Sequence, residues 1–160
     1  MPYSGLAYSI LDTKTRFSEI KVKVKLSQIN NLNFSATTQS GHQVIMDGSE
    51  ADGGSNAGAR PMEVVLSGLG GCSAIDVILI LKKSKQQVSH CEIDIQAERA
   101  DAVPAVFTKI HLHYIVHGSD LSAKKVERAV NLSMENYCSV TRMLEPTVDI
   151  TADFEIIDAQ

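Results

Sequence analysis

The sequence contains few aromatic residues and no concentration of charge of one sign. Tryptophan is absent, aromatic residues make up 5% of the 160 residues, and the formal net charge is −4. A nucleic-acid-binding surface usually combines clustered Lys and Arg with interleaved aromatic residues, so we expect no nucleic-acid partner. The longest apolar run, residues 62–81, is interrupted by Glu63, Asp76 and three glycines. We therefore interpret it as a buried helix of a soluble protein and expect no membrane partner.

Cysteine is also scarce, with only Cys72, Cys91 and Cys138 in the chain. The count is odd and no CxxC motif occurs, which argues against a disulfide scaffold and a zinc ribbon. The first residues lack the basic start and apolar run of a secretory signal. We therefore expect a cytoplasmic location, where a cysteine is either a small buried hydrophobe or a redox-active or catalytic group.

Hydrophobic periodicity predicts the order β-β-β-α-β-β-α-β. Alternating patterns predict strands over residues 20–26, 31–37, 42–48, 89–99, 106–118 and 147–157. Two helices are predicted over about 62–85 and 122–144, with Pro61 in the first turn of one and Pro146 after the other. Most strands form hairpins, so the predicted class is α+β with a largely antiparallel sheet.

The length favours a single domain over residues 1–160, with an N-terminal arm over 1–18 and a glycine-rich loop over 49–60. Apolar residues of the first helix face almost every direction, which predicts burial nearly all round. One sheet face and one other helix cannot cover such a helix, so a dimer is expected. The second helix should place one broad face in the core, formed by Val126, Ala129, Val130, Met134, Tyr137, Cys138, Thr141 and Leu144.

Cys72 lies among three glycines in the middle of the most apolar helix. Each glycine costs about 1 kcal/mol in a helix interior, so something must approach the backbone closely. Either a neighbouring element packs there, or an open slot admits a substrate to the sulfur. Cys91 belongs to the apolar face of a strand, which favours a buried hydrophobe. Cys138 is either a core residue or a thiol influenced by Arg142, four residues later.

The histidines do not indicate a metal site. His111 and His113 share one strand face, but Lys109 and His117 lie on it too, which favours a solvated sheet face. No HExxH or Ser-His-Asp pattern is present, and no Gly-Lys-Ser/Thr closes the glycine-rich loop. We expect no bound metal.

Two segments together resemble the OsmC/Ohr family, in particular its YhfA-like branch. They are "PMEVVLSGLGGCSAIDVILILKK" and the stretch from "FTKIHLHYIVHGSDL" to "VERAVNLSMENYCSV". The resemblance covers residues 22–157. It implies an intertwined homodimer in which antiparallel sheets wrap two long central helices.

The resemblance also implies a cofactor-free thiol peroxidase that reduces organic hydroperoxides in oxidative-stress defence. Cys72 matches the peroxidatic cysteine, Cys138 the resolving cysteine, and Glu63 a glutamate that pairs with an arginine to hold the thiolate. A dithiol reductant, of the lipoyl type in some members of the family, would then reduce the Cys72–Cys138 disulfide.

The activating arginine of such peroxidases lies in an N-terminal "GGR" stretch that this sequence lacks. Arg60 is the nearest candidate, followed by Arg142, with Arg16 as another. Glu63 follows Pro61 by two residues instead of one. The alternative hypothesis is a redox-sensing or small-ligand-binding protein without efficient peroxidase turnover. A third is a structural dimer whose cysteines only fill the core.

Overall fold

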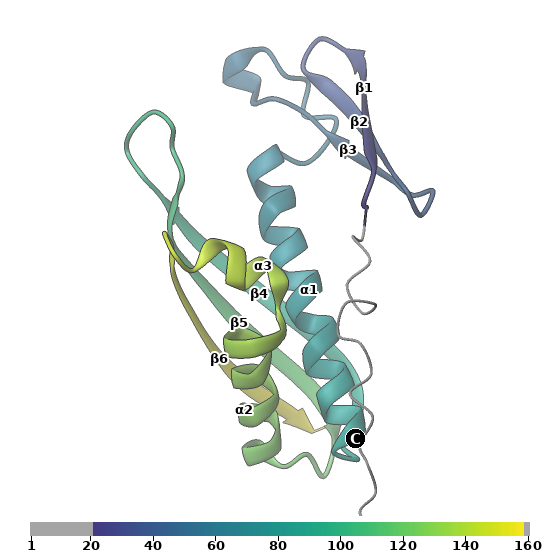
Figure 1. The fold of residues 1–160 in the computed structure, drawn as a ribbon, viewed down its shortest axis with the longest axis vertical. Helices are drawn as coiled ribbons and strands as arrows, with labels where there is room; N and C mark the ends of the chain where they lie inside the picture. The colour runs from purple at the N-terminus through teal and green to yellow at the C-terminus, as the bar shows by residue number, and fades with distance from the viewer. Residues whose placement is uncertain (1–20, 159–160) are drawn as a thin grey trace, which may run out of the picture. The chain divides into compact units, whose positions relative to one another are not determined.

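The computed structural model describes residues 21–158. The chain divides into two compact units, one ending at Ala59 and the other beginning at Arg60. The order of the main elements agrees with the predicted β-β-β-α-β-β-α-β order (Figure 1). The predicted arm over residues 1–18, with Arg16, lies outside the described residues.

Unit 1 contains a three-stranded antiparallel sheet in the order β1-β2-β3. Its strands are β1 (Val24–Asn30), β2 (Asn33–Thr38) and β3 (Gln43–Met46). Asn31 lies in the β1–β2 turn with a φ of 37°, a conformation that asparagine tolerates better than most residues. A 3₁₀ turn, η2 (Glu50–Asp52), follows in the glycine-rich loop.

Asp47 organises this loop through its side chain. Its carboxylate accepts the backbone N–H of Gly48 at 2.8 Å, Ser55 at 2.9 Å and Ala57 at 3.0 Å. The hydrogen bond from the Ala57 N–H is the main cause that lowers the pKa of Asp47, although burial opposes it. The loop is therefore held by one buried carboxylate, which composition alone did not predict.

Unit 2 contains the long helix α1 and a three-stranded sheet in the order β4-β5-β6. Its elements are α1 (Pro61–Lys83), β4 (Gln87–Arg99), β5 (Phe107–Ser119), α2 (Ala123–Leu132), η3 (Ser133–Tyr137), α3 (Ser139–Leu144) and β6 (Asp149–Asp158). The helices lie on one face of the sheet (Figure 1). β4 and β5 are antiparallel, but β5 and β6 are parallel. The parallel pair follows from the helical crossover through α2 and α3, which returns the chain in the same direction.

The core of unit 2 lies between this sheet and the helices. β5 alternates as predicted, with Ile110, Leu112, Tyr114 and Val116 buried and the histidines between them on the other face. These side chains pack with buried residues of α1 and α2, namely Leu69, Val77, Leu81, Val126, Ala129 and Val130.

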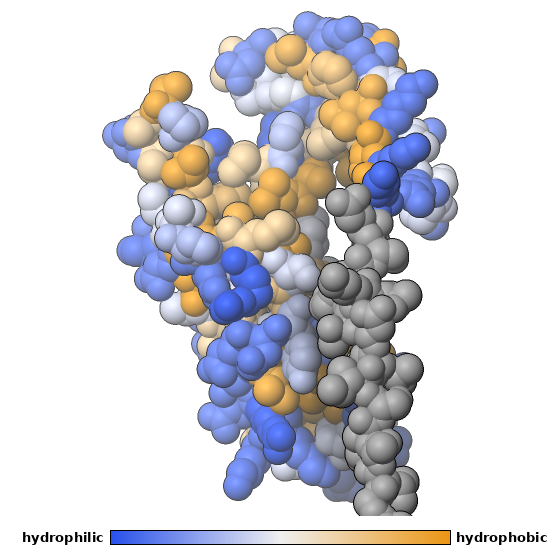
Figure 2. Space-filling view, viewed as in Figure 1, coloured by the Kyte–Doolittle hydropathy of each residue, from blue (hydrophilic) through white to orange (hydrophobic). Residues whose placement is uncertain are grey.

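Helix α1 is buried on one side only in the single chain, as expected if one sheet face and one other helix cover only part of it. Leu69, Val77 and Leu81 are fully buried, but Ile75 and Leu79 are 62% and 49% exposed. Within residues 21–158 it is the one helix long and apolar enough to cross a membrane, and 28% of its most apolar window is buried. The β4-β5-β6 sheet and α2 cover only one side of α1. Figure 2 shows apolar surface interspersed with hydrophilic surface on the face that it draws.

The predicted single helix over residues 122–144 is interrupted. α2 ends at Leu132, a π-helical turn spans Ser133–Tyr137, and α3 begins after Cys138. The Cys138 N–H donates to the Ser133 carbonyl at 2.9 Å, five residues earlier. An extra residue in a turn rotates the following side chains by about 100°. Tyr137 is therefore 58% exposed instead of packed in the core, while Cys138 is buried.

Candidate active site with a thiol pair between α1 and α3

The structure brings Cys72 and Cys138 together. Cys72 lies on α1 and is half-buried, whereas Cys138 lies between η3 and α3 with no exposed surface. Burial is the main cause that raises the pKa of the Cys138 thiol, and a hydrogen bond and charge interaction with Cys72 raise it further. Both cysteines are free thiols. Cys72 is therefore the more exposed residue of a reduced pair, and Cys138 is the fully buried one.

Backbone groups hold the Cys138 sulfur at the start of α3. The Thr141 N–H donates to Sγ at 3.5 Å, and Cys138 is the N-cap residue of α3. The thiol itself points toward the Leu69 carbonyl of α1 at 4.0 Å. The sulfur is therefore oriented toward the helix that carries Cys72, and hydrogen bonds with Thr141 lower its pKa against the larger effect of burial.

Glu63 and Arg60 meet at the N-terminus of α1. The Arg60 backbone N–H donates to the Glu63 carboxylate at 2.8 Å, and the Glu63 N–H donates to the Arg60 carbonyl at 2.9 Å. Glu63 thus satisfies a backbone donor at the helix start and complements the positive end of the helix dipole. This geometry defines a capping role for its carboxylate.

Arg142 lies on α3, close in sequence to Cys138, but its side chain engages another partner. Its Nη1 lies 2.6 Å from the Glu145 carboxylate, and the Arg142 side chain is 57% exposed. Only its backbone reaches back to Cys138, with the Arg142 N–H donating to the Cys138 carbonyl at 3.1 Å. The guanidinium therefore forms a surface ion pair in this structure.

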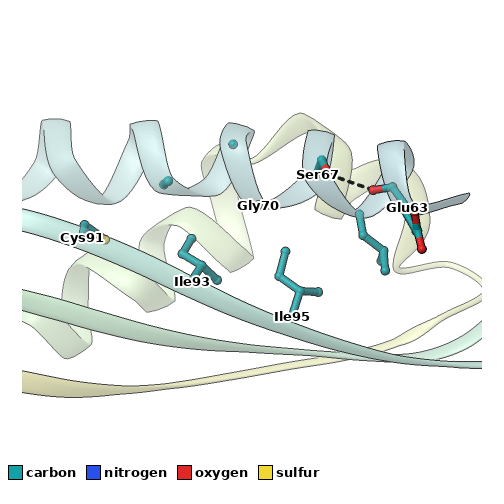
Figure 3. Close-up of a pocket in the computed structure, with 9 residues that line it drawn as sticks. Glu63, Ser67, Gly70, Cys91, Ile93 and Ile95 are labelled. Atoms are coloured by element: carbon teal, nitrogen blue, oxygen red, sulfur yellow. Dashed lines mark hydrogen bonds between the residues drawn. The ribbon is translucent and has the colours of Figure 1, made fainter. Parts of the chain in front are cut away.

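A groove of about 450 Å³ runs between α1 and β4, and the sulfur in its wall is Cys91 (Figure 3). Its walls are mostly apolar, with Ile93 and Ile95 beside Cys91 on β4 and Glu63 near one end. Burial, and then the charge of Glu92, raise the pKa of Cys91. The prediction placed Cys91 on the apolar face of its strand, and the structure adds that this thiol borders a cavity.

The glycines of α1 do two different things. A Cβ at Gly70 would lie 2.7 Å from the Ile95 Cδ1, so glycine permits the close approach of β4 there. A Cβ at Gly68 or Gly71 would meet nothing within 4 Å. A packed neighbour is therefore present at Gly70, whereas the space beside Gly68 and Gly71 is open, and a substrate path to the Cys72 sulfur stays a prediction.

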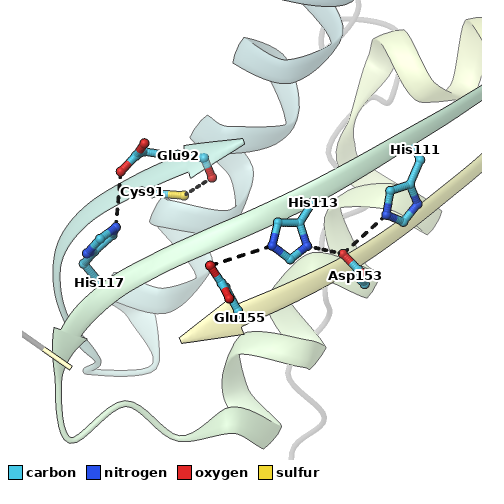
Figure 4. A network of polar contacts seen from close by, with 7 residues as sticks. All are labelled: Cys91, Glu92, His111, His113, His117, Asp153 and Glu155. Carbon is cyan, nitrogen blue, oxygen red and sulfur yellow. Dashed lines mark hydrogen bonds and ion pairs between the residues drawn. The ribbon is translucent and has the colours of Figure 1, made fainter. Parts of the chain in front are cut away.

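The exposed face of the second sheet carries the histidines (Figure 4). Asp153 on β6 lies 2.5 Å from the His113 Nδ1 and 3.4 Å from the His111 Nε2. Glu92 lies 3.2 Å from the His117 Nε2. No group of three or more His, Cys, Asp and Glu in the described part of the chain could hold a metal ion. The predicted solvated face is confirmed by the burial of the opposite side chains.

The sequence did not predict the buried hydroxyl groups that lie near the thiol pair. Ser73, Tyr114 and Ser133 are fully buried and hydrogen-bonded to one another through Ser73. The available signal was Ser73 on the buried side of an otherwise apolar helix, directly after Cys72. A buried hydroxyl requires a partner, but the sequence does not say which element supplies it.

Comparison with known proteins agrees with this architecture. The family model described as "OsmC-like protein" matches residues 53–153. Protein YhfA of Escherichia coli strain K12 is 45% identical over 138 residues, which cover 86% of this chain and all of YhfA. The chain therefore belongs to the OsmC-like family.

Solved structures have the same fold. A hypothetical protein from Aquifex aeolicus VF5 is 28% identical with a TM-score of 0.78, and the match covers 88% of this chain and 98% of that one. An organic hydroperoxide resistance protein OsmC from Legionella pneumophila is 14% identical with a TM-score of 0.66, and the match covers 86% and 98% of the two chains. The predicted OsmC-like α+β fold is thereby confirmed.

Proposed function

We propose that this protein is a cysteine-based thiol peroxidase that reduces organic hydroperoxides. The observation that carries the proposal is the pairing of a half-buried thiol, Cys72, with a fully buried thiol, Cys138. Cys72 is the more exposed of the two, so it is the proposed site of reaction with the peroxide. The buried member is protected from direct oxidation and lies where it can react with its neighbour. Membership of a family that includes organic hydroperoxide resistance proteins supports the same assignment.

The chemistry proceeds in two thiol steps. The Cys72 thiolate attacks one oxygen of the O–O bond, the bond breaks, and the alkoxide leaves as an alcohol after it takes up a proton. Cys72 is then a sulfenic acid. The Cys138 sulfur attacks this sulfur and releases water, which forms the Cys72–Cys138 disulfide. A dithiol reductant returns the two electrons, and no metal or cofactor takes part.

Glu63 and Arg60 are the proposed supporting residues. A guanidinium near Cys72 would favour the thiolate and stabilise the departing alkoxide. Arg60 adjoins Glu63 at the start of the helix that carries Cys72, which makes it the first choice. Arg142 would have to leave Glu145 before it could serve, so it is the second.

A homodimer in the cytoplasm is part of the same proposal. The exposed apolar stripe of α1, with Ile75 and Leu79, is the surface that a second copy would cover. Free, unbridged cysteines suit the reducing environment in which a dithiol reductant is available. A lipoyl-type dithiol is the proposed reductant class.

A redox sensor or ligand-binding protein is the second candidate function. The ion pair between Arg142 and Glu145 favours it, because this candidate arginine is engaged away from the thiol pair. In that case Cys72 would react with a peroxide once and the protein would remain oxidised. The difference between the two functions is therefore the number of turnovers.

The test is consumption of cumene hydroperoxide with dihydrolipoamide as reductant. We expect multiple turnovers in the wild type and none in Cys72→Ser. Cys138→Ser should react once and then accumulate sulfinic acid at Cys72, which intact-mass spectrometry detects. Cys91→Ser is the matched control and should turn over normally, since this thiol lies outside the pair.

One equivalent of oxidation without further turnover would contradict the peroxidase and support the sensor. A Cys72 that fails to react in the folded protein would contradict both functions and leave a structural dimer.

A further inference from the structure

A chain of buried hydroxyl groups links the residue after Cys72 to the turn that ends at Cys138. Ser73 on α1 is hydrogen-bonded to the Tyr114 hydroxyl of β5 and, at 2.9 Å, to the Ser133 hydroxyl of η3. All three residues have no exposed surface. Three elements that are far apart in the sequence therefore meet at one serine.

Ser133 carries this connection to Cys138. Its hydroxyl lies 3.3 Å from the Ser73 carbonyl and 3.4 Å from the Asp76 carboxylate, both on α1. Its own carbonyl accepts the Cys138 N–H at 2.9 Å, which closes the π-helical turn. One residue is thus bonded to α1 through its side chain and to the buried cysteine through its backbone.

Met134 completes the network as a sulfur acceptor. The Tyr114 hydroxyl donates to its Sδ at 3.6 Å, and the Ser73 hydroxyl lies 3.7 Å from the same atom. The Thr141 hydroxyl, at 4.0 Å, approaches it from α3. The π-helical turn is therefore held by contacts at its first two residues, Ser133 and Met134.

We infer that Ser73, Tyr114 and Ser133 are positioning residues that hold the Cys138 sulfur in reach of Cys72. Without the π turn, α2 would continue with a regular pitch and Cys138 would rotate by about 100° relative to α1. Buried hydroxyl groups hold one arrangement because each alternative leaves a donor unpaired. The inference rests on the proposed function, because the Cys72–Cys138 disulfide belongs to that function. It concerns only the closure of the disulfide, which is separate from peroxide reduction.

Disulfide closure can be measured without a peroxide. The aromatic disulfide dithiobisnitrobenzoate reacts with the Cys72 thiolate, which forms a mixed disulfide and releases one thionitrobenzoate anion. The Cys138 sulfur then loses its proton and attacks the Cys72 sulfur, which releases the second anion and closes the Cys72–Cys138 bond. The rate of the second release, independent of reagent concentration, reports how well Cys138 is placed.

The experiment compares Tyr114→Phe, Ser73→Ala and Ser133→Ala in a Cys91→Ser background that removes the third thiol. We expect an unchanged first release and a second release slowed by about tenfold to hundredfold, the range for small misplacements of reacting groups. Tyr137→Phe is the matched control, since it removes the hydroxyl of an exposed tyrosine in the same turn, and both releases should match the parent.

A second release within about twofold of the parent in the folded variants would overturn the inference. If Tyr114→Phe fails to fold, the two serine variants decide, because each removes another hydroxyl of the same network and leaves Tyr114 unchanged. A variant that is only less stable should not slow the second thionitrobenzoate release while it leaves the first unchanged. Normal disulfide closure with no hydroperoxide turnover would count against the proposed function and leave the positioning role intact.

Discussion

At the scale of single residues, the two thiols of the pair differ in how far solvent reaches them. Cys138 is fully buried, and burial is the main cause that raises the pKa of its thiol. Cys72 keeps an accessible side. This difference in burial supports the proposed roles of Cys72 as the attacking sulfur and Cys138 as the resolving sulfur.

The His113–Asp153 pair gives a pH-dependent contribution to stability. The hydrogen bond that His113 donates to the Asp153 carboxylate is the main cause that raises the pKa of His113 above 6.5, and the same bond lowers the pKa of Asp153 below 3.8. The histidine contribution is complete below pH 6.5 and is lost as the pH rises through its raised pKa. The carboxylate contribution is complete above pH 3.8 and is lost as the pH falls through its lowered pKa.

We therefore expect Asp153→Asn to lower the melting temperature most at about pH 5.5, between these limits, and least at about pH 9. Thermal unfolding followed by circular dichroism measures the difference. Asp149→Asn is the matched control, since it removes an exposed carboxylate from the same strand. Equal losses at both pH values would show that the pair contributes nothing that depends on the histidine charge.

At the scale of elements, helix α1 combines a capped start with a packed middle. Glu63 accepts the Arg60 N–H at its N-terminus, and Gly70 allows Ile95 of β4 to pack against its backbone. The helix is thereby held at the level of the thiol pair. Glu63 has a structural role here in addition to the proposed one toward Cys72.

Two substitutions separate these roles of Glu63. Glu63→Gln keeps an oxygen acceptor for the Arg60 N–H, so its free energy of unfolding should fall by only a few tenths of a kcal/mol, about the value of one charge near a helix end. Glu63→Ala removes the acceptor and should cost about 1 kcal/mol. Urea unfolding measures both. If the carboxylate charge serves the thiolate, both variants should lose peroxidase activity equally despite their different stabilities.

Equal stability losses in the two variants would contradict the capping role. Full activity in Glu63→Gln would contradict the proposed charge interaction with an arginine and leave the cap as the function of this residue.

At the scale of the whole molecule, the single chain leaves an apolar helix face exposed. Ile75 and Leu79 project from α1 with about half or more of their surface accessible, although they belong to the most apolar segment of the chain. Exposed apolar stripes of this kind usually mark an interface between proteins. A second copy is the occupant we propose.

Leu79→Glu should shift the protein from dimer to monomer, because a dimer would bury the new carboxylate in an apolar interface. Light scattering coupled to size-exclusion chromatography measures the molar mass. Val103→Glu is the matched control, since Val103 is fully exposed in the loop between β4 and β5 and the substitution should leave the dimer intact. A wild-type protein with the mass of one chain would refute the dimer.

Periodicity in the sequence was enough to predict the element order, the α+β class and the inward side of β5. The reason is local, because alternation in a strand and apolar spacing in a helix depend only on neighbouring residues. The family resemblance also predicted that Cys72 and Cys138, on two different helices, form a pair. The bounds of α1, residues 61–83, lie close to the predicted 62–85.

The tertiary structure alone decided the π-helical turn, the parallel pairing of β6 and the partners of the charged side chains. Ser133, the first residue of the turn, is hydrogen-bonded to Ser73, which is bonded to Tyr114, and both partners are remote in sequence from it. His113 pairs with Asp153 because β5 and β6, which are distant in sequence, lie side by side in the sheet. A buried hydroxyl or a charge takes the partner that packing brings near it, and packing is set by contacts between distant segments that no local pattern encodes.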